Sequence, residues 1–229
     1  DLINGAGTNL RAEINTGGNG LLIQDGSPRG STGTIRIEES GEGTHTARDL
    51  GILTPTGGAV GNRFIGEALN PQITEGTPLS LLNRAQGLDL ESILIENGPL
   101  SGKIDLSRVS TVGGLIKALN ESGLDLKAKI NELGTGVEVT SIVGGRTLKI
   151  SNGPNNFNAN LLGIEGSRDV LVDPVSPLGD NTDLMAALEG ETRLKDLNQG
   201  AGVSRGVIRI TDSLGASINI DISNVNSIQ

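Results

Sequence analysis

The side chains best suited to catalysis are few in this sequence. His45, the only histidine, lies in the stretch Gly-Glu-Gly-Thr-His-Thr, just before a predicted one-turn helix. A hydrolytic triad would need this histidine beside a serine and a carboxylate. An internal repeat, described below, places Phe157 near the position of His45, and phenylalanine cannot act as a base. We therefore expect His45 to lie in a surface loop, and we expect the protein not to be an enzyme.

Acidic and glycine-rich stretches could hold ions. Asp180-Asn181-Thr182-Asp183 offers oxygen ligands to calcium, and Asp25 or Gly41-Glu42-Gly43 could join a surface site. The EF-hand spacing and its closing glutamate are missing, so turns are the expectation, and a weak cation site near Asp180 and Asp183 stays open. Gly17-Gly18-Asn19-Gly20 and Gly144-Gly145 lack the Lys-Ser/Thr ending of a phosphate-binding loop, and they predict tight turns.

The remaining candidate binding residues are basic. Four basic side chains alternate along predicted strands and are expected in solvent: Lys127, Lys129, Arg205 and Arg209. A zinc site needs three or four ligands of the cysteine, histidine or carboxylate type, and the chain has one histidine and no cysteine. The sequence therefore assigns no catalytic, cofactor-binding or metal-binding residue, and it predicts no cofactor.

Composition narrows the function classes further. The 229 residues carry a formal net charge of -9 and include 35 Gly, 2 Phe and no Trp, Tyr or Cys. A negative field repels phosphate backbones, so nucleic acid is not an expected partner. Cores must be built from Leu, Ile and Val, which favours small modules over a thick enzyme core. No apolar run approaches the roughly 18 residues of a membrane span, so no membrane insertion is expected.

One amphipathic helix organises the pattern. In the stretch 109–120, Val112, Leu115, Ile116 and Leu119 recur at i, i+3, i+4 and i+7, after an oxygen acceptor at Ser110 or Thr111. A helix this short is marginal in water by itself, so its apolar stripe must lie on a sheet.

Parts of this helix recur at both ends of the chain. Ser107–Gly113 matches Ser223–Gln229, 116 residues later, and Leu2–Gly7 matches Ala118–Gly123 at the same offset. The chain thus begins near the end of one such helix and stops near the start of another, as expected of an interior piece of a longer protein.

Strand patterns repeat with a similar offset. Residues 8–40 read as three strands separated by glycine turns, and residues 126–150 repeat them. We predict an α+β fold of tandem small β-rich modules (ββαβββ with short helices), with glycine-rich turns, in an elongated repeat array. The predicted division is 1–53, the C-terminal half of a module; 54–76, a connection; 77–166, a complete module; 167–190, a connection; and 191–229, the N-terminal half of a further module. We expect flanking sequence or a neighbouring chain to complete each half.

The order strand, strand, helix, strand, together with Ile-Asn pairs, resembles the flagellin hook IN motif. The resembling stretches are Lys103–Thr140 and Arg205–Ile228, and the Ile-Asn pairs are Ile14-Asn15 and Ile130-Asn131. Asp196-Leu197-Asn198, Ile210-Thr211-Asp212-Ser213 and Asp49-Leu50-Gly51-Ile52 extend the likeness to tandem hook IN units of flagellum-associated proteins. Such motifs occur in flagellins, hook-associated proteins and the filament cap protein.

This resemblance implies a structural role and no catalytic residues. It implies an exported, extracellular component of the bacterial flagellum, in the hook, the junction, the cap or the outer filament. The implied partners are flagellin, hook or hook-associated proteins, with possible self-association. The terminal coiled-coil heptads through which such proteins polymerise are absent here. The alternative is an exported surface adhesin or a cation- or glycan-binding repeat module, although glycan sites usually carry the aromatic side chains that this chain lacks.

Overall fold

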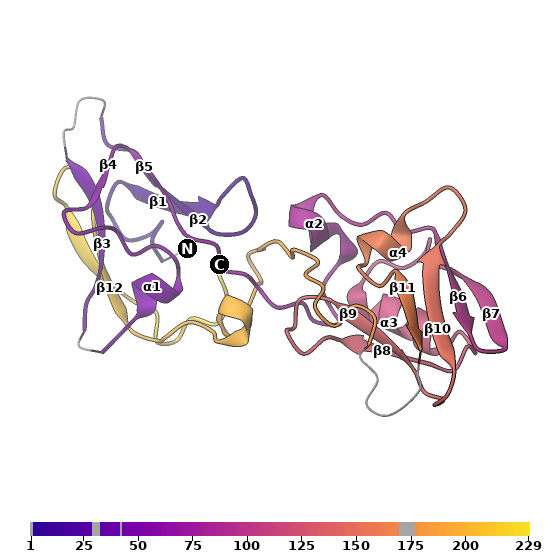
Figure 1. Ribbon diagram of the computed structural model, residues 1–229. Helices are drawn as coiled ribbons and strands as arrows, with labels where there is room; N and C mark the ends of the chain where they lie inside the picture. The colour runs from indigo at the N-terminus through magenta and orange to yellow at the C-terminus, as the bar shows by residue number, and fades with distance from the viewer. Residues whose placement is uncertain (1, 29–32, 42, 170–176) are drawn as a thin grey trace. The chain divides into compact units, whose positions relative to one another are not determined.

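The computed structural model describes residues 2–28, 33–41, 43–169 and 177–229 (Figure 1). The chain forms two units. Unit 1 combines Asp1–Pro71 with Ala187–Gln229, and unit 2 is Gln72–Ala186. Strands account for 31% of the residues and helices for 14%, so the fold is a β-rich α+β fold. Unit 2 is therefore inserted, in sequence, into a discontinuous unit 1.

Unit 2 contains a four-stranded antiparallel sheet in the order β11-β10-β6-β7 and a hairpin, β8-β9. Its elements, in chain order, are η1 (Leu79–Leu81), α2 (Leu82–Ala85), β6 (Ser92–Asn97), β7 (Leu100–Asp105), α3 (Val112–Asn120), β8 (Leu126–Ile130), β9 (Val137–Ser141), β10 (Thr147–Asn152), α4 (Asn158–Leu161) and β11 (Gly166–Asp169).

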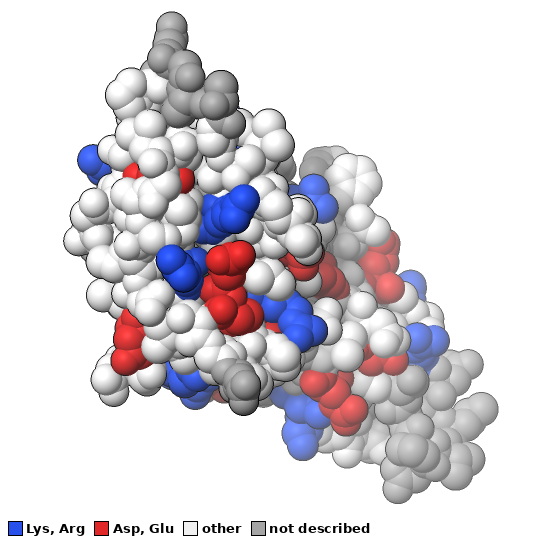
Figure 2. Space-filling view, turned by 90° about the vertical axis from the view of Figure 1, so that its left-hand side faces the viewer, with Lys and Arg blue, Asp and Glu red and all other residues white. Residues whose placement is uncertain are grey.

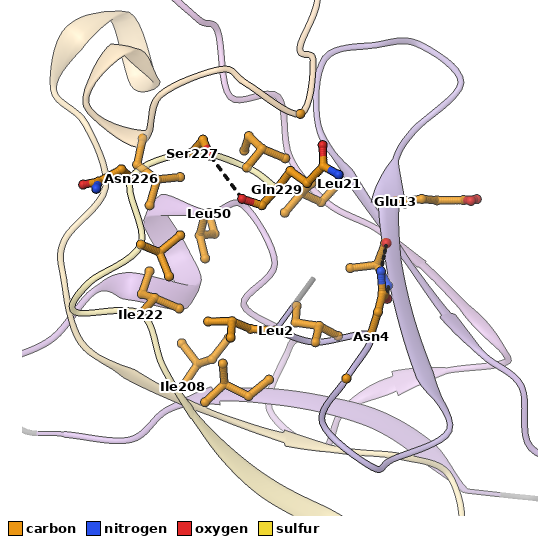
Figure 3. Close-up of a pocket in the computed structure, with 18 of the residues that line it drawn as sticks. Leu2, Asn4, Glu13, Leu21, Leu50, Ile208, Ile222, Asn226, Ser227 and Gln229 are labelled. Atoms are coloured by element: carbon orange, nitrogen blue, oxygen red, sulfur yellow. Dashed lines mark hydrogen bonds between the residues drawn. The ribbon is translucent and has the colours of Figure 1, made fainter.

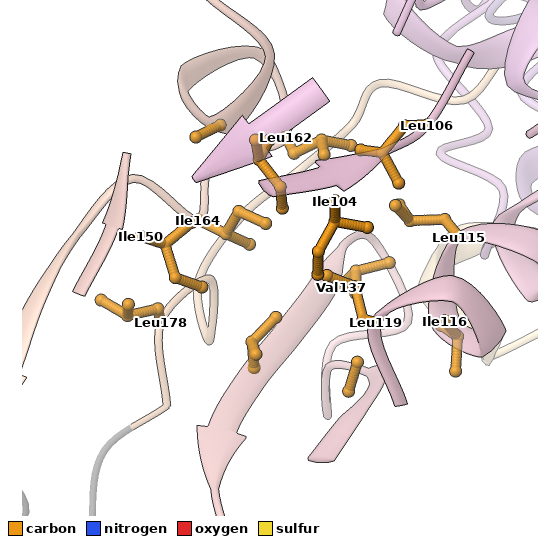
Figure 4. Close-up of a cluster of buried hydrophobic side chains, with 14 of the residues drawn as sticks. Ile104, Leu106, Leu115, Ile116, Leu119, Val137, Ile150, Leu162, Ile164 and Leu178 are labelled. Atoms are coloured by element: carbon orange, nitrogen blue, oxygen red, sulfur yellow. The ribbon is translucent and has the colours of Figure 1, made fainter. Parts of the chain in front are cut away.

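Helix α3 confirms the predicted amphipathic helix. Its N-cap residue, Thr111, accepts a hydrogen bond from the Gly114 backbone N–H at 3.1 Å, which satisfies one of the free donors of the first turn. All four residues of the predicted stripe are buried: Val112, Leu115, Ile116 and Leu119. Figure 4 shows Leu115 and Leu119 pointing into the same apolar cluster as Ile104 and Val137. The helix thus closes the core of unit 2.

Unit 1 contains the four-stranded sheet β13-β12-β3-β4 and the three-stranded sheet β1-β2-β5, with all pairs antiparallel. Its elements are β1 (Leu10–Ile14), β2 (Leu21–Asp25), β3 (Thr34–Glu39), α1 (Thr46–Asp49), β4 (Ala59–Val60), β5 (Arg63–Ile65), η2 (Leu194–Asp196), η3 (Asn198–Gly200), β12 (Val207–Thr211) and β13 (Ser217–Asp221).

In the four-stranded sheet of unit 1 the two central strands, β3 and β12, pair with each other and come from opposite ends of the chain. Ile37 lies opposite Ile210, and Arg209 lies opposite Glu38. The expectation that flanking sequence or a neighbouring chain completes the segments 1–53 and 191–229 is therefore wrong. In the structure each segment completes the other, because their apolar faces bury one common core.

The two units have the same internal arrangement. The order β4-β3-β12-β13 in unit 1 matches β11-β10-β6-β7 in unit 2, and the pair Ile37–Ile210 matches Ile150–Ile95. The segments 8–40 and 126–150, predicted to be alike, each form three strands in the same order. The two units thus share one arrangement of strands, but the chain starts this arrangement at a different element in each unit. Unit 1 is in this sense a permuted copy of unit 2.

The predicted connections contain structure of their own. Within 54–76, β4 extends the sheet of β3 and β5 extends that of β2. Within 167–190, Leu178 forms an isolated bridge with Val139, and residues 170–176 lie outside the described residues. The segment 77–83 contains a single 3-10 turn, η1, which ends where the backbone of Leu82 is extended, with ψ 167°.

The sheet face of unit 1 mixes charges of both signs. Arg36 and Glu38 of β3 are exposed there, as is Arg209 of β12. Figure 2 shows acidic and basic side chains lying next to one another on this face. Over the described ranges, no helix is long and apolar enough to cross a membrane.

Candidate functional site

Unit 1 contains a mostly apolar pocket of about 820 Å³, which we term the terminal pocket. It is lined by Leu2, Ile3, Asn4, Gly5, Ala12, Glu13, Ile14, Leu21, Leu50, Gly190, Leu194, Ile208, Ile220, Ile222, Asn224, Val225, Asn226, Ser227, Ile228 and Gln229. Figure 3 shows Leu2, Leu50, Ile208 and Ile222 around its interior. Both ends of the chain therefore contribute to one site, and its volume lies in the range of about 300–1,000 Å³ typical of ligand pockets.

The N-terminal side of the pocket copies the end of helix α3. In unit 2, Asn120 donates to the Ala128 carbonyl at 3.1 Å and accepts from the Ala128 N–H at 2.6 Å. In unit 1, Asn4 donates to the Ala12 carbonyl at 3.1 Å and accepts from the Ala12 N–H at 2.7 Å. Residues 2–5 thus occupy the position of the last turn of α3, although they form a turn and not a helix.

The C-terminal side of the pocket copies the start of the same helix. The Ile228 N–H donates to the Thr192 carbonyl at 3.0 Å, as the Val112 N–H donates to Thr77. The Gln229 N–H then donates to the Gly190 carbonyl, also at 3.0 Å. In unit 2 the corresponding hydrogen bond runs from the Gly113 N–H to the Glu75 carbonyl at 2.8 Å.

Between these two sides, the middle turn of the helix has no counterpart in the described part of unit 1. In unit 2 this turn is Gly114, Leu115 and Ile116, and the last two supply half of the buried stripe. The apolar residues that such a turn would cover, among them Leu21 and Ile222, remain as pocket lining. The terminal pocket of unit 1 therefore lies at the position that this turn occupies in unit 2.

One of the residues that line the pocket, Glu13, is charged. Glu13 is exposed, and Figure 3 shows its carboxylate pointing away from the interior. Its Oε1 accepts a hydrogen bond from Gln24 at 2.5 Å. Leu2 is 49% exposed, so the turn at residues 2–5 covers the site incompletely. The lining of the terminal pocket is mostly apolar.

His45 takes no part in this site. It is the N-cap residue of α1, and Arg48 Nη2 donates to its Nδ1 at 2.7 Å. Phe157 caps α4 with nearly the same backbone angles, φ -124° against -127°, which confirms their predicted equivalence. The structure therefore supports the interpretation of His45 as an exposed loop residue.

Ser204 lies in a Gly-x-Ser-x-Gly stretch, Gly202 to Gly206, and an expectation that the sequence holds no such stretch would be wrong. The serine precedes strand β12 and does not sit on a strand-to-helix turn. Its Oγ donates to Asp49 Oδ2 at 2.5 Å. In the part of the chain that the structure describes, no hydrogen bond joins Ser204 to His45, so these residues do not form a triad.

The acidic candidates are used in turns. Asp183 accepts from the Met185 N–H at 2.7 Å, and Asp180 accepts from the Asn181 N–H at 3.0 Å. Over the described ranges, no three acidic, histidine or cysteine residues gather as a metal site would require. Of the stretch Gly41-Glu42-Gly43, Glu42 lies outside the described residues.

The glycine candidates form turns, as predicted. Gly17–Gly20 connects β1 to β2, and Gly144–Gly145 connects β9 to β10. A Cβ on Gly20 would lie 2.5 Å from the Glu67 carbonyl oxygen, so this position requires glycine.

The four basic candidates are exposed, as predicted. Lys129 also forms an ion pair, because its Nζ lies 3.0 Å from Oε1 of the buried Glu138. A hydrogen bond to Glu138 and its charge raise the pKa of Lys129.

Two buried carboxylates that the sequence did not single out as a pair hold the halves of unit 1 together. Asp212 Oδ2 accepts from the Asn9 N–H at 3.1 Å and from Asn9 Nδ2 at 2.8 Å. Asp25 Oδ2 accepts from the Ser213 N–H at 2.8 Å. Burial raises the pKa of each carboxyl, but these and neighbouring hydrogen bonds outweigh that effect and leave both pKa values below the ordinary aspartate value.

No protein-family model matches this sequence, and no curated protein or solved structure is significantly similar to it.

Proposed function

We propose that this chain is a structural component of the bacterial flagellum that acts through contacts between subunits. One observation carries the structural part of the proposal. The two units keep the same strand order and register while polar side chains at equivalent positions differ: Glu13 and Lys129, His45 and Phe157, Asp212 and Asn97. Catalysis needs a fixed set of polar groups, whereas an assembly module needs a fixed shape.

The flagellar setting comes from the resemblance to the hook IN motif. Of the stretches that carry it, Lys103–Thr140 contains the end of β7, helix α3, β8 and most of β9. Arg205–Ile228 contains β12 and β13. In this proposal the units belong to a tandem array outside the cell, and flagellin, hook or hook-associated proteins are the neighbours.

Labelling intact cells that produce the protein tests this function. Antibodies raised against the 229-residue chain are expected to decorate the flagellum, and the label should disappear when flagella are sheared off. A deletion strain should swim poorly and regain motility when the gene is restored. Label spread over the cell body, with normal swimming of the deletion strain, would contradict the flagellar role and favour a surface adhesin.

A further inference from the structure

We propose that a small set of side chains at corresponding positions of the two units determines which hairpin of the chain pairs with which partner segment. In unit 2 the β6-β7 hairpin packs on residues 121–186, and in unit 1 the β12-β13 hairpin packs on residues 1–71. Because both hairpins have the same register to their neighbours, their backbones could exchange places. The proposal concerns this choice of partner and does not require the flagellar setting.

Apolar contacts do not distinguish the two hairpins. Ile95 lies opposite Ile150, and Ile210 lies opposite Ile37. None of these four side chains is more than 1% exposed. An exchange of the hairpins would again place isoleucine opposite isoleucine, so the selection must come from positions at which the hairpins differ.

The buried polar residue at the end of the inner strand differs between the hairpins. Asn97, 0% exposed, donates through Nδ2 to the carbonyls of Leu124 at 2.8 Å and Asp125 at 3.2 Å. Asp212, 1% exposed, instead accepts hydrogen bonds from the backbone and the side chain of Asn9. With the β12-β13 hairpin in the place of β6-β7, the Asp212 carboxylate would face two carbonyl oxygens, which cannot donate. A buried carboxylate without its donors strongly disfavours this exchange.

Side-chain size differs at the next position. A Cβ on Gly98 would lie 2.9 Å from Cδ of Arg146, the residue before β10. In unit 1 the larger residue is on the hairpin, because a Cβ on Gly33, the residue before β3, would overlap the Ser213 carbonyl. In the exchanged pairing, the Ser213 side chain would meet Arg146, whose Nη1 is held 2.6 Å from Asp125 Oδ2. The glycine of each unit therefore fits only the partner that it has.

A third position opposes the reverse exchange. Ser204, which precedes β12, donates its N–H to Asp49 Oδ2 at 2.9 Å and its Oγ–H to the same oxygen at 2.5 Å. The corresponding residues of unit 2 are Asp89 and Leu161. With the β6-β7 hairpin on residues 1–71, Asp89 would bring a second carboxylate to Asp49, and like charges repel. Each of the two exchanged pairings thus contains a mismatch that the observed pairings avoid.

Disulfide trapping in the full chain measures the choice of partner, because the sequence contains no cysteine. Thr211 of β12 lies opposite Arg36 of β3, and Glu96 of β6 corresponds to Thr211. Opposite positions on paired strands are close enough for a disulfide. Arg36→Cys with Thr211→Cys therefore reports the observed pairing, and Arg36→Cys with Glu96→Cys reports the exchanged pairing. After refolding in a glutathione buffer, the first pair should form an intramolecular disulfide and the second should stay reduced.

Exchanging the three selecting positions between the hairpins should redirect the pairing. This exchange variant combines six substitutions: Ser204→Asp, Asp212→Asn, Ser213→Gly, Asp89→Ser, Asn97→Asp and Gly98→Ser. The fraction of disulfide between positions 36 and 96 should rise at least about tenfold, because one unpaired buried polar group shifts a folding equilibrium by about that factor. The matched control, Lys103→Asn with Asn219→Lys, exchanges corresponding exposed residues of the edge strands β7 and β13 and should leave this fraction unchanged.

A uniform variant removes the selection while each unit keeps matched partners. It gives unit 1 the residues of unit 2 through six substitutions: Asn9→Asp, Gly33→Arg, Asp49→Leu, Ser204→Asp, Asp212→Asn and Ser213→Gly. Circular dichroism should show a folded chain. Since both hairpins then present the same residues, the disulfide between positions 36 and 96 should again rise at least about tenfold over the unaltered reporter.

The uniform variant decides the matter if the exchange variant does not fold. A folded exchange or uniform variant with no more of this disulfide than the unaltered reporter would overturn the proposal. An equal rise in the control at Lys103 and Asn219 would do the same. Failure of the uniform variant to fold would also count against the proposal, because the matched residues would then not be interchangeable as a set.

Discussion

Ile37 of β3 and Ile210 of β12 lie opposite each other and are both 0% exposed, although all of unit 2 separates them along the chain. This pair places segments from the two ends of the sequence in one sheet. The fold of unit 1 therefore depends on a long-range contact that local sequence does not encode.

We predict that Ile37→Ala destabilises both strands of this pair. Removing a fully buried isoleucine side chain typically costs about 2–5 kcal/mol. Hydrogen exchange of the β12 amides, residues 207–211, should accelerate together with that of β3. The matched variant Ile150→Ala, at the equivalent position in unit 2, should accelerate exchange in β6 and β10 instead. Unchanged protection of β12 in Ile37→Ala would contradict the pairing.

The two units should behave differently when expressed as fragments. Unit 2, residues 72–186, is continuous and contains its own core, so it should fold alone. Residues 1–71 lack β12 and β13, so they should remain unfolded until residues 187–229 are added. Circular dichroism and the dispersion of amide NMR signals would measure this. A folded 1–71 fragment with no gain on mixing would show that the discontinuous unit is wrong.

Loss of the α3 cap should destabilise unit 2 specifically. In Thr111→Ala the Gly114 N–H loses its side-chain acceptor, and such a change typically costs about 1 kcal/mol. Thr111→Ser keeps the hydroxyl and should stay within a few tenths of a kcal/mol of the original protein. Urea denaturation of the fragment 72–186 measures both variants, and equal stability of all three proteins would exclude a role for this cap.

Unit 1 should lose stability in acid because of Asp25 and Asp212. Their folded-state pKa values lie below the ordinary aspartate value of about 3.9. Their stabilising effect is therefore fully present above that value and is lost as pH falls through the lower, folded-state values. Denaturation midpoints of unit 1 measured from pH 6 downward should show this decline.

The variant Asp212→Asn separates this contribution from others. It removes the charge that accepts two hydrogen bonds from Asn9, so unit 1 should be less stable at neutral pH, and its stability should fall less steeply in acid. Unit 2 carries Asn97 at the equivalent position and serves as the internal reference. An acid profile of unit 1 identical to that of the unaltered chain would show that Asp212 does not contribute.

The paired asparagines Asn4 and Asn120 should stabilise their units to different extents. Asn120→Ala removes two hydrogen bonds to Ala128 in a part-buried setting and should destabilise unit 2 by about 1–2 kcal/mol. Asn4→Ala removes the same bonds in an exposed setting, so its effect on unit 1 should be smaller. Urea denaturation of the two units measures both variants, and a larger loss for Asn4→Ala than for Asn120→Ala would contradict the effect of burial.

Sequence periodicity predicted the local elements well. The alternation of Leu10, Ala12 and Ile14 indicates a strand, and the spacing of the four α3 side chains indicates a helix, because burial on one side of an element leaves a period in the sequence. The repeat offset likewise predicted that β1 to β3 and β8 to β10 form alike. The short strands β4 and β5 were not predicted, since two or three residues are too few to show a period.

The sequence by itself determined the longer strands and helix α3, since these depend on neighbours a few positions away. Only the tertiary structure decided that β3 pairs with β12, that Asp212 meets Asn9, and that the two chain ends enclose a pocket. Those contacts join segments far apart along the chain. The free energy that selects them comes from burial of a shared core, which no local pattern records.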